Sequence, residues 1–239
     1  MNKKLGIIGG MGPLATADFY RRIVELTPAS CDQEHIETYI LSVPGIPRRV
    51  EYIMGEGGED PGPVLRELAQ KLEAMGVDVI AIPCVTAHFF YDEICEGLGV
   101  PVLSMVTETV RQLKEKKIGR VGLLGTRATI ECGILQQGLV KDGIEAVLPD
   151  SGEEDIISKI IFEEIKQGRE ADREKLFWVM DRMMERGADK CLIACTDLSA
   201  GLGNNKRVST DGDMESVQRG KYIDLMDVLA LAAVRNCCK

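Results

Sequence analysis

The chain has 239 residues, of which 45% are hydrophobic, and its formal net charge is −9. This length suits one large α/β domain or two domains of roughly 100–120 residues each, and the hydrophobic content suffices for a packed core. An acidic chain without a basic run is a poor match for nucleic acid or an anionic membrane. Because neither an apolar stretch of about 18 residues nor a secretion signal occurs, we expect a soluble, cytoplasmic protein.

Short apolar runs alternate with amphipathic patterns along the whole chain. In the first half we predict strands at 5–9, 38–43 and 77–83, with helices at 13–26 and 61–75. In the second half we predict strands at 121–124, 146–148 and 190–194, with helices at 129–141, 155–167, 173–186 and 225–235. This alternation is typical of an α/β fold in which helices cover both faces of parallel sheets.

The two halves of the chain resemble each other. Residues 4–9 match residues 120–125, and residues 76–86 match residues 187–196. In each half a cysteine, Cys84 or Cys195, follows a later strand, where parallel sheets bind ligands. If the halves face each other about a pseudo-twofold axis, the two thiols meet across one cleft. The alternative is that both cysteines are small buried hydrophobic residues, the usual state of a free cysteine.

The cysteines are spread over the chain at positions 31, 84, 95, 132, 191, 195, 237 and 238. Disulfide frameworks belong to small secreted chains, so we expect reduced thiols. There is no C-x-x-C pair, and the two histidines lie far from any group of cysteines, so we expect no metal site. Cys191 is expected to pack in the core. Cys237 and Cys238 are expected to lie, without a role, on a fraying tail.

Two facing thiols suit the inversion of a carbon centre. A base must remove a proton from one face while an acid supplies one to the other, because a single group would return the proton to its original face. A thiolate is a competent base, and positive charge or a helix N-terminus lowers a thiol pKa from about 8.5. Since no pyridoxal-phosphate motif is present, preorganised donors must stabilise the carbanion. Candidate donors are the backbone of residues 9–12 and the hydroxyls of Thr86, Thr126 and Thr196.

At these residues the chain resembles the aspartate/glutamate racemase family, which includes hydantoin racemases. The resemblance lies in a first loop (9–16, GGMGPLAT), two cysteine motifs (83–88, PCVTAH; 194–197, ACTD), the turn at 125–126, and the segments 45–49 and 164–168. It implies two similar Rossmann-like α/β domains with parallel sheets, related by a pseudo-twofold axis, with the active site in the cleft between them. The implied domains are residues 1–107 with 208–239, and residues 108–207.

The resemblance also implies an activity. This is cofactor-independent racemisation at Cα of a small acidic amino acid, aspartate or glutamate, or of a related carboxylate, by a homodimer. Cys84 and Cys195 are the implied catalytic acid/base pair. The implied substrate-binding residues are Gly10, Met11, Arg49, Val85, Thr86, Thr126, Lys166, Thr196 and Asp197. Arg48 and His88 are further candidates.

Three positions depart from the family's pattern in the binding residues. Val85 stands where asparagine is usual, Arg48 where aspartate is usual, and Asp197 where glutamate is usual. Arg48 beside Arg49 adds positive charge, which favours an acidic substrate. Two alternatives stay open: an isomerase or decarboxylase of another small carboxylic acid on the same fold, or a non-catalytic relative that binds a small molecule.

Two further signals have competing interpretations, and a third predicts a loop. Residues 10–15 fit the dinucleotide fingerprint G-x-G-x-x-A, but no acid ends the second strand, so a carboxylate at this helix N-terminus is favoured. His88 either tunes Cys84 or acts as an acid, or it has a structural role at a helix start, and the structural role is favoured. Residues 209–220 are polar and contain glycine, which predicts a loop near the cleft.

Overall fold

The computed structural model describes residues 2–203 and 220–238. Contacts divide the chain into two compact units: Met1–Glu108 with Met226–Lys239, and Thr109–Leu225. The domain boundary expected at residues 207 and 208 and most of the loop expected at 209–220 lie outside the described residues. Residues 220–225, which the sequence placed with the first domain, lie in the second unit, because they include a strand of its sheet.

The first unit is built on a parallel three-stranded sheet of order β2-β1-β3. Its strands are β1 (Leu5–Gly9), β2 (Thr38–Ser42) and β3 (Val79–Ala81). Every residue of β1 is buried, as expected for the central strand of a sheet covered on both faces. The register pairs Gly9 with Ser42 and Ile7 with Ala81, so the carboxyl ends of all three strands lie along one edge.

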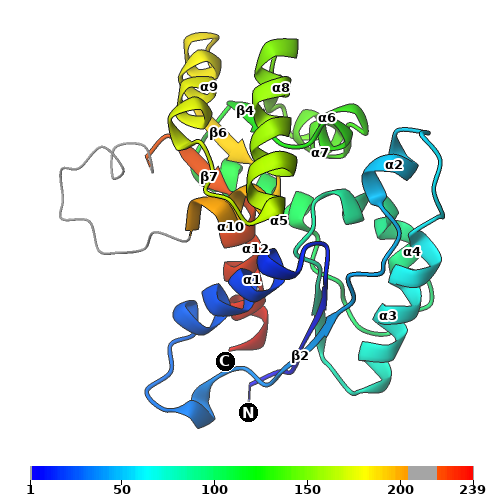
Figure 1. Ribbon diagram of the computed structural model, residues 1–239. Helices are drawn as coiled ribbons and strands as arrows, with labels where there is room; N and C mark the ends of the chain where they lie inside the picture. Colours follow the sequence, from blue (N-terminus) through cyan, green and yellow to red (C-terminus); the bar gives the residue numbers. More distant parts are fainter. Residues whose placement is uncertain (1, 204–219, 239) are drawn as a thin grey trace. The chain divides into compact units, whose positions relative to one another are not determined.

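Helices cover both faces of this sheet, with α1 and α12 on one side and α3 and α4 on the other (Figure 1). Side chains from α3, α4 and the sheet form one apolar core that includes Leu65, Leu72, Ile80 and Ile94. The helices and turns of this unit are α1 (Pro13–Leu26), η1 (Asp32–Glu34), α2 (Arg49–Ile53), α3 (Gly62–Ala74), η2 (Thr86–Phe90), α4 (Tyr91–Cys95), α5 (Met105–Glu115) and α12 (Leu225–Cys237). Helices α5 and α12 each include residues on both sides of a unit boundary.

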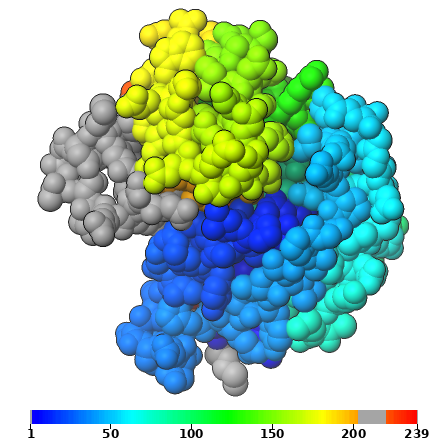
Figure 2. Space-filling model, viewed as in Figure 1, coloured from blue at the N-terminus to red at the C-terminus, as the bar shows by residue number. Residues whose placement is uncertain are grey.

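The second unit is built on a parallel four-stranded sheet of order β5-β4-β6-β7. Its strands are β4 (Arg120–Leu124), β5 (Glu145–Val147), β6 (Lys190–Ile193) and β7 (Tyr222–Asp224). The helices and turns are α6 (Arg127–Glu131), α7 (Ile134–Lys141), α8 (Ser151–Lys159), the π turn η3 (Ile160–Glu164), η4 (Ile165–Gln167), α9 (Arg173–Glu185) and α10 (Thr196–Gly203). Side chains fill the space between α8 and α9 (Figure 2). The predicted α/β class with parallel sheets is therefore confirmed.

Several predicted elements differ from the observed ones. The helix expected at 129–141 is two helices, because Gly133 between them has a φ of 66°. The helix expected at 155–167 begins earlier, at Ser151, where Asp150 and Glu153 form a capping box. It then ends in the turns η3 and η4. The sequence analysis also missed β7, α2, α4 and α5.

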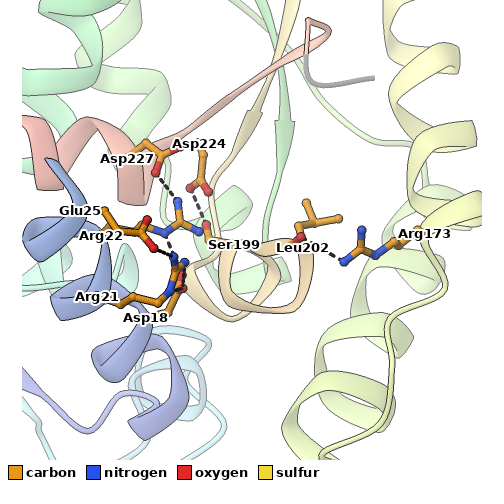
Figure 3. Close-up of polar contacts among 9 residues, drawn as sticks. All are labelled: Asp18, Arg21, Arg22, Glu25, Arg173, Ser199, Leu202, Asp224 and Asp227. Atoms are coloured by element: carbon orange, nitrogen blue, oxygen red, sulfur yellow. Dashed lines mark hydrogen bonds and ion pairs between the residues drawn. The ribbon is translucent and has the colours of Figure 1, made fainter. Parts of the chain in front are cut away.

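The C-terminal helix is held more firmly than expected. Cys237 is 1% exposed, and its carbonyl accepts a hydrogen bond from the Lys3 N–H (2.9 Å), so the prediction of a fraying tail there is wrong. Earlier in this helix, Asp227 pairs with the buried guanidinium of Arg22 (2.5 Å). Arg22 also pairs with Asp18 on its own helix at 2.8 Å (Figure 3). These ion pairs join α12 to α1 within the first unit.

None of the described helices is long and apolar enough to cross a membrane.

Candidate active site

The first loop follows β1 and is held by Thr16. The Gly10 N–H donates to Thr16 Oγ1 (2.9 Å), and the Thr16 hydroxyl donates to the Gly12 carbonyl (2.9 Å). Gly10 has a φ of 94°, and a Cβ there would lie 2.4 Å from the backbone of Val43, so no other residue fits this position. Met11 is buried. The loop is therefore a fixed backbone surface at the carboxyl edge of the first sheet.

Cys84 lies at the same sheet edge, three residues after β3 ends. The residue is 4% exposed, and its Sγ lies 3.4 Å from Thr86 Oγ1. Thr86 and Val85 are also buried, and Thr86 begins the short turn η2. The first unit thus brings together the glycine loop and the Cys84 turn, as expected for strand ends of one parallel sheet.

His88 holds the backbone of this turn. Its Nδ1 lies 2.9 Å from the Cys84 carbonyl, and its Nε2 lies 3.0 Å from the Met105 N–H. A backbone N–H can only donate, so Nε2 is the unprotonated nitrogen and Nδ1–H donates to Cys84. Burial lowers the pKa of His88, which keeps the ring neutral. Both nitrogens are engaged with backbone, so the geometry gives His88 a structural role.

The two neighbouring arginines have different surroundings. Arg48 is 80% exposed and pairs with Glu51 at 2.5 Å, one turn along α2. Arg49 is half-buried, and its Nη1 donates to the Pro47 carbonyl (2.9 Å) and, over 3.3 Å, to the Ile46 carbonyl. Its buried Nε has no partner among the residues that the structure describes. Arg49 therefore has a buried N–H without a partner in this part of the chain, whereas Arg48 is an exposed residue paired with Glu51.

Cys195 follows β6 and directly precedes α10. Burial is the largest cause that raises the pKa of this thiol, to about 12, and the Asp197 carboxylate adds to it. The backbone N–H groups of Leu198 and Asp197 act in the opposite direction, as does Lys166. These N–H groups belong to the first turn of α10, and a helix N-terminus favours the thiolate. Thr196 is also buried in this turn.

Lys166 lies in the short turn η4, and its side chain extends to the turn that follows Cys195. Its Nζ lies 2.6 Å from the Asp197 carboxylate, which is mostly buried. The residue before it, Ile165, packs against Gly201, where a Cβ would lie 2.6 Å from Ile165 Cδ1. A π turn precedes this residue, as is common where a helix is adjusted for function. The ion pair gives the thiol one positive and one negative neighbour.

Thr126 lies at the carboxyl edge of the second sheet, after β4. Its Oγ1 caps α6 by accepting the Thr129 N–H (3.2 Å). The Ala194 N–H donates to the Leu124 carbonyl (2.7 Å), which ties the end of β6 to the end of β4. The second unit therefore brings Thr126 to the same edge as Cys195.

Sequence reasoning missed two buried polar residues beside Cys195. The Ser199 hydroxyl lies 2.6 Å from the Asp224 carboxylate at the end of β7 (Figure 3). Ser199 is four residues after Cys195, as His88 is four residues after Cys84, and this shared spacing was the available signal. Figure 3 also shows Arg173 donating to the Leu202 carbonyl (3.0 Å), which satisfies the end of α10.

The remaining thiols form no disulfide, and the possible metal ligands are dispersed over the described residues. All eight cysteines are free, and burial raises the pKa of Cys191 to about 12. Within residues 2–203 and 220–238, no group of three or more His, Cys, Asp or Glu side chains is arranged to hold a metal ion.

Comparison with known proteins agrees with this arrangement. The model of the family described as Asp/Glu/Hydantoin racemase matches residues 8–231. The broad specificity amino-acid racemase RacX of Bacillus subtilis is 32% identical over 206 residues, which are 83% of this chain and 87% of that protein. The Picrophilus torridus aspartate racemase structure is 30% identical, with a TM-score of 0.79 over 97% of this chain and 93% of that one.

An aspartate racemase homologue from Pyrococcus horikoshii shares the fold, with a TM-score of 0.74 at 23% identity over 98% of each chain. The family match covers most of the chain, and the relatives match it over nearly their whole lengths. The chain therefore belongs to the Asp/Glu/hydantoin racemase family, as an amino-acid racemase.

Proposed function

We propose that the protein racemises amino acids at Cα without a cofactor, with Cys84 and Cys195 acting on opposite faces of one substrate. The observation that carries this proposal is the matched placement of the two thiols. Each follows a strand of its own parallel sheet, each is less than a tenth exposed, and each precedes a helical turn. Two buried thiols at ligand-binding sheet edges are the groups that a two-base inversion needs.

In this mechanism one cysteine is a thiolate and the other a thiol. The thiolate takes the α-proton, and the C–H electron pair stays on the substrate as a carbanion conjugated with its carboxylate. The second thiol gives its proton to the opposite face and becomes the thiolate. The raised pKa of Cys195 keeps its thiol protonated in the ligand-free site. The thiol that abstracts from one enantiomer donates in the reverse reaction, so the two cysteines exchange roles with the direction of racemisation.

The residues around the thiols supply the carbanion's stabilisation. The backbone N–H of Met11, next to the Gly10 N–H that Thr16 holds, and the hydroxyls of Thr86, Thr126 and Thr196 are preorganised donors for the substrate carboxylate. They are fixed before substrate arrives, because Thr16 holds the loop and each of these threonines is buried. Such donors stabilise negative charge more as it grows, which lowers the barrier to removing the α-proton.

We propose aspartate or glutamate as the substrate. Asp197 receives the substrate ammonium in place of Lys166, and Lys166 is then released toward the side-chain carboxylate. The Nε–H of Arg49, which has no partner among the described residues, is a second donor for that carboxylate. A second candidate is racemisation of many amino acids. Val85 favours it, because a buried valine replaces an amide in the first cysteine motif. The relative RacX is itself named a broad specificity racemase.

We also propose that the protein works as a cytoplasmic homodimer. The free cysteines are consistent with a reducing compartment. Light scattering coupled to gel filtration measures the mass in solution. A mass of one chain at working concentration would remove the dimer from the proposal.

The test is incubation of the purified protein in deuterium oxide with a panel of acidic and neutral L- and D-amino acids. The α-proton signal is followed by NMR and the enantiomer ratio by chiral chromatography. We expect exchange with racemisation for aspartate or glutamate. Turnover of neutral amino acids at similar rates would favour the broad specificity candidate. No exchange with any amino acid would remove the proposed reaction.

Replacing either thiol tests the mechanism itself. Cys84→Ala and Cys195→Ala should each lower racemisation by about 10²–10⁴-fold, the usual contribution of a positioned acid or base. Each variant keeps one thiol, so exchange without inversion should persist for one enantiomer, and the two variants should retain opposite ones. A variant that racemises at the parent rate would contradict the two-thiol mechanism.

A further inference from the structure

The residue four positions after each cysteine has the same task in both units. In the first unit, His88 Nδ1–H donates to the Cys84 carbonyl over 2.9 Å. In the second unit, the Ser199 N–H donates to the Cys195 carbonyl over 3.1 Å, and the Ser199 hydroxyl lies 3.3 Å from the same carbonyl. Both residues are buried, at 2% and 0% exposure.

Each of these residues is also joined to a second element of its own unit. His88 Nε2 accepts the N–H of Met105, the first residue of α5, at 3.0 Å. The Ser199 hydroxyl has one proton, and the 2.6 Å distance to Asp224 Oδ1 assigns that proton to the carboxylate. Asp224 is the last residue of β7. Thus each cysteine carbonyl is linked, through the residue four positions on, to an element distant in sequence.

Packing alone does not explain these two side chains. A buried polar group costs free energy unless it is hydrogen-bonded, and an apolar residue of similar size fills the same volume without that cost. Here the donors and acceptors are arranged so that the cysteine backbone is held, and with it the direction of the Cα–Cβ bond that carries the sulfur. Proton transfer is sensitive to such placement, since a 1 Å error can cost about 10²-fold in rate.

We propose that His88 and Ser199 are equivalent positioning residues, each of which orients the thiol of its own unit. This inference rests on the proposed two-thiol function. His88 orients Cys84 through its side chain, and Ser199 orients Cys195 through its backbone N–H and its bond to Asp224. Neither residue transfers a proton to the substrate.

Substitutions at His88, Ser199 and Asp224 can remove one hydrogen bond of each pair and keep the other. In His88→Asn the amide keeps a donor near Nδ1 and loses the acceptor for Met105. In His88→Gln the amide keeps an acceptor near Nε2 and loses the donor to Cys84. Ser199→Ala removes the bond to Asp224, whereas Asp224→Asn keeps an acceptor for the Ser199 hydroxyl. Thr27→Val is a matched control, because it removes a buried hydroxyl bond (to the Ile23 carbonyl, 2.7 Å) at the far end of α1.

The first measurement is the rate at which iodoacetamide alkylates each cysteine, resolved by peptide mass spectrometry. It does not require a substrate or an active enzyme. We expect His88→Gln to raise the rate at Cys84 about tenfold, as fits the loss of one buried hydrogen bond, and to leave Cys195 unchanged. His88→Asn should have the smaller effect on Cys84. Ser199→Ala should raise the rate at Cys195 alone, Asp224→Asn should do so less, and Thr27→Val should change neither rate.

The second measurement is the primary isotope effect with α-deuterated L- and D-substrate. A misplaced thiol slows its own proton transfer and makes that step more rate-limiting. His88→Gln should therefore raise the isotope effect for one enantiomer and lower it for the other, and Ser199→Ala should do the reverse. A loss of folded protein lowers the rate but leaves both isotope effects unchanged.

The outcomes separate the two proposals. If the parent protein exchanges no α-proton, the proposed function fails, and the alkylation rates still decide whether His88 and Ser199 orient the thiols. If the parent racemises, but both cysteines respond equally to each variant or neither responds, the positioning roles are overturned.

Discussion

The turns at Cys84 and Cys195 have the same backbone arrangement, in which a cysteine after a strand is followed by a helical turn. They differ in the charged side chains near the sulfur. In the first unit Cys84 is followed by the apolar Val85, and the nearby His88 is neutral. In the second unit Cys195 is followed by a turn that carries the Asp197–Lys166 ion pair. An amino acid is itself asymmetric, with a cationic ammonium and an anionic carboxylate. In the proposed function, the shared geometry serves proton transfer and the charged turn receives the ammonium.

The largest expected effect of this asymmetry is on substrate binding. Asp197→Asn keeps the side chain's size and removes its charge. We expect kcat/KM to fall by about 10–100-fold, mainly through KM, because a hydrogen bond to a charged group contributes about 1.5–3 kcal/mol. Steady-state kinetics with the best amino acid of the panel measure it.

Asp181→Asn is the matched control in the same unit, because Asp181 pairs with Lys221 away from the thiol. Its kcat/KM should stay within a factor of about two, as for other exposed pairs. An unchanged KM in Asp197→Asn would mean that the ammonium binds elsewhere, and the asymmetry between the turns would then need another explanation.

Gly9 ends β1 and Gly125 directly follows β4, and these two glycines should differ in how well they tolerate alanine. A Cβ at Gly9 would lie 2.3 Å from Thr16 Cγ2, whereas at Gly125 the nearest atoms, of Ala194 and Thr129, lie at 3.1–3.2 Å. Thr16 cannot turn away without breaking its bonds to Gly10 and Gly12. Overpacking costs about 1–3 kcal/mol. We therefore expect Gly9→Ala to fall at the upper end of that range and Gly125→Ala at the lower end, measured by urea unfolding. Equal decreases in the free energy of unfolding would show that the loop after β1 accommodates a Cβ as easily as the loop after β4.

The pH dependence of thiol reactivity should also separate the turns. The Asp197 carboxylate helps to raise the pKa of Cys195, because it disfavours a second negative charge nearby. Removing it in Asp197→Asn lowers that pKa, so more thiolate exists at a given pH. We expect the alkylation profile of Cys195 to move to lower pH and that of Cys84 to stay in place. A shift at both cysteines would contradict the local origin of this effect.

The thiols and the sheet edges could be predicted because their signals are local. Cys84 and Cys195 each follow a short continuous apolar run, which is typical of a buried strand, and repeated motifs mark the equivalence. The same holds for the loop at Gly10. Element ends were harder to predict: the helical pattern of 129–141 runs through Gly133, and only its left-handed backbone shows the break. The strand β7 has three residues, too few for a periodic signal.

The parts of the site that the sequence left open or missed depend on contacts between distant residues. The role of His88 is decided by the Met105 N–H, seventeen residues further along the chain. Ser199 meets Asp224 across 25 positions. The ion pair of Lys166 with Asp197 likewise depends on how the turns η3 and η4 leave α8. Neither residue type nor spacing specifies such pairings, because they follow from packing of the folded chain.

The smallest expected effect concerns the arginine that the sequence analysis added to the positive charge of the site. Arg48 is 80% exposed and its charge is matched by Glu51 on the next turn. Exposed pairs of this kind contribute about 0–1 kcal/mol. Arg48→Ala should therefore change the free energy of unfolding by less than about 0.5 kcal/mol and leave kcat/KM unchanged. Arg49→Ala should raise KM for acidic amino acids, because it removes a guanidinium whose Nε has no partner in residues 2–203 and 220–238. If Arg48→Ala raised KM as much as Arg49→Ala, Arg48 would have to leave Glu51 and contact the substrate. The Cys84 side of the site would then carry more positive charge with substrate bound than without it.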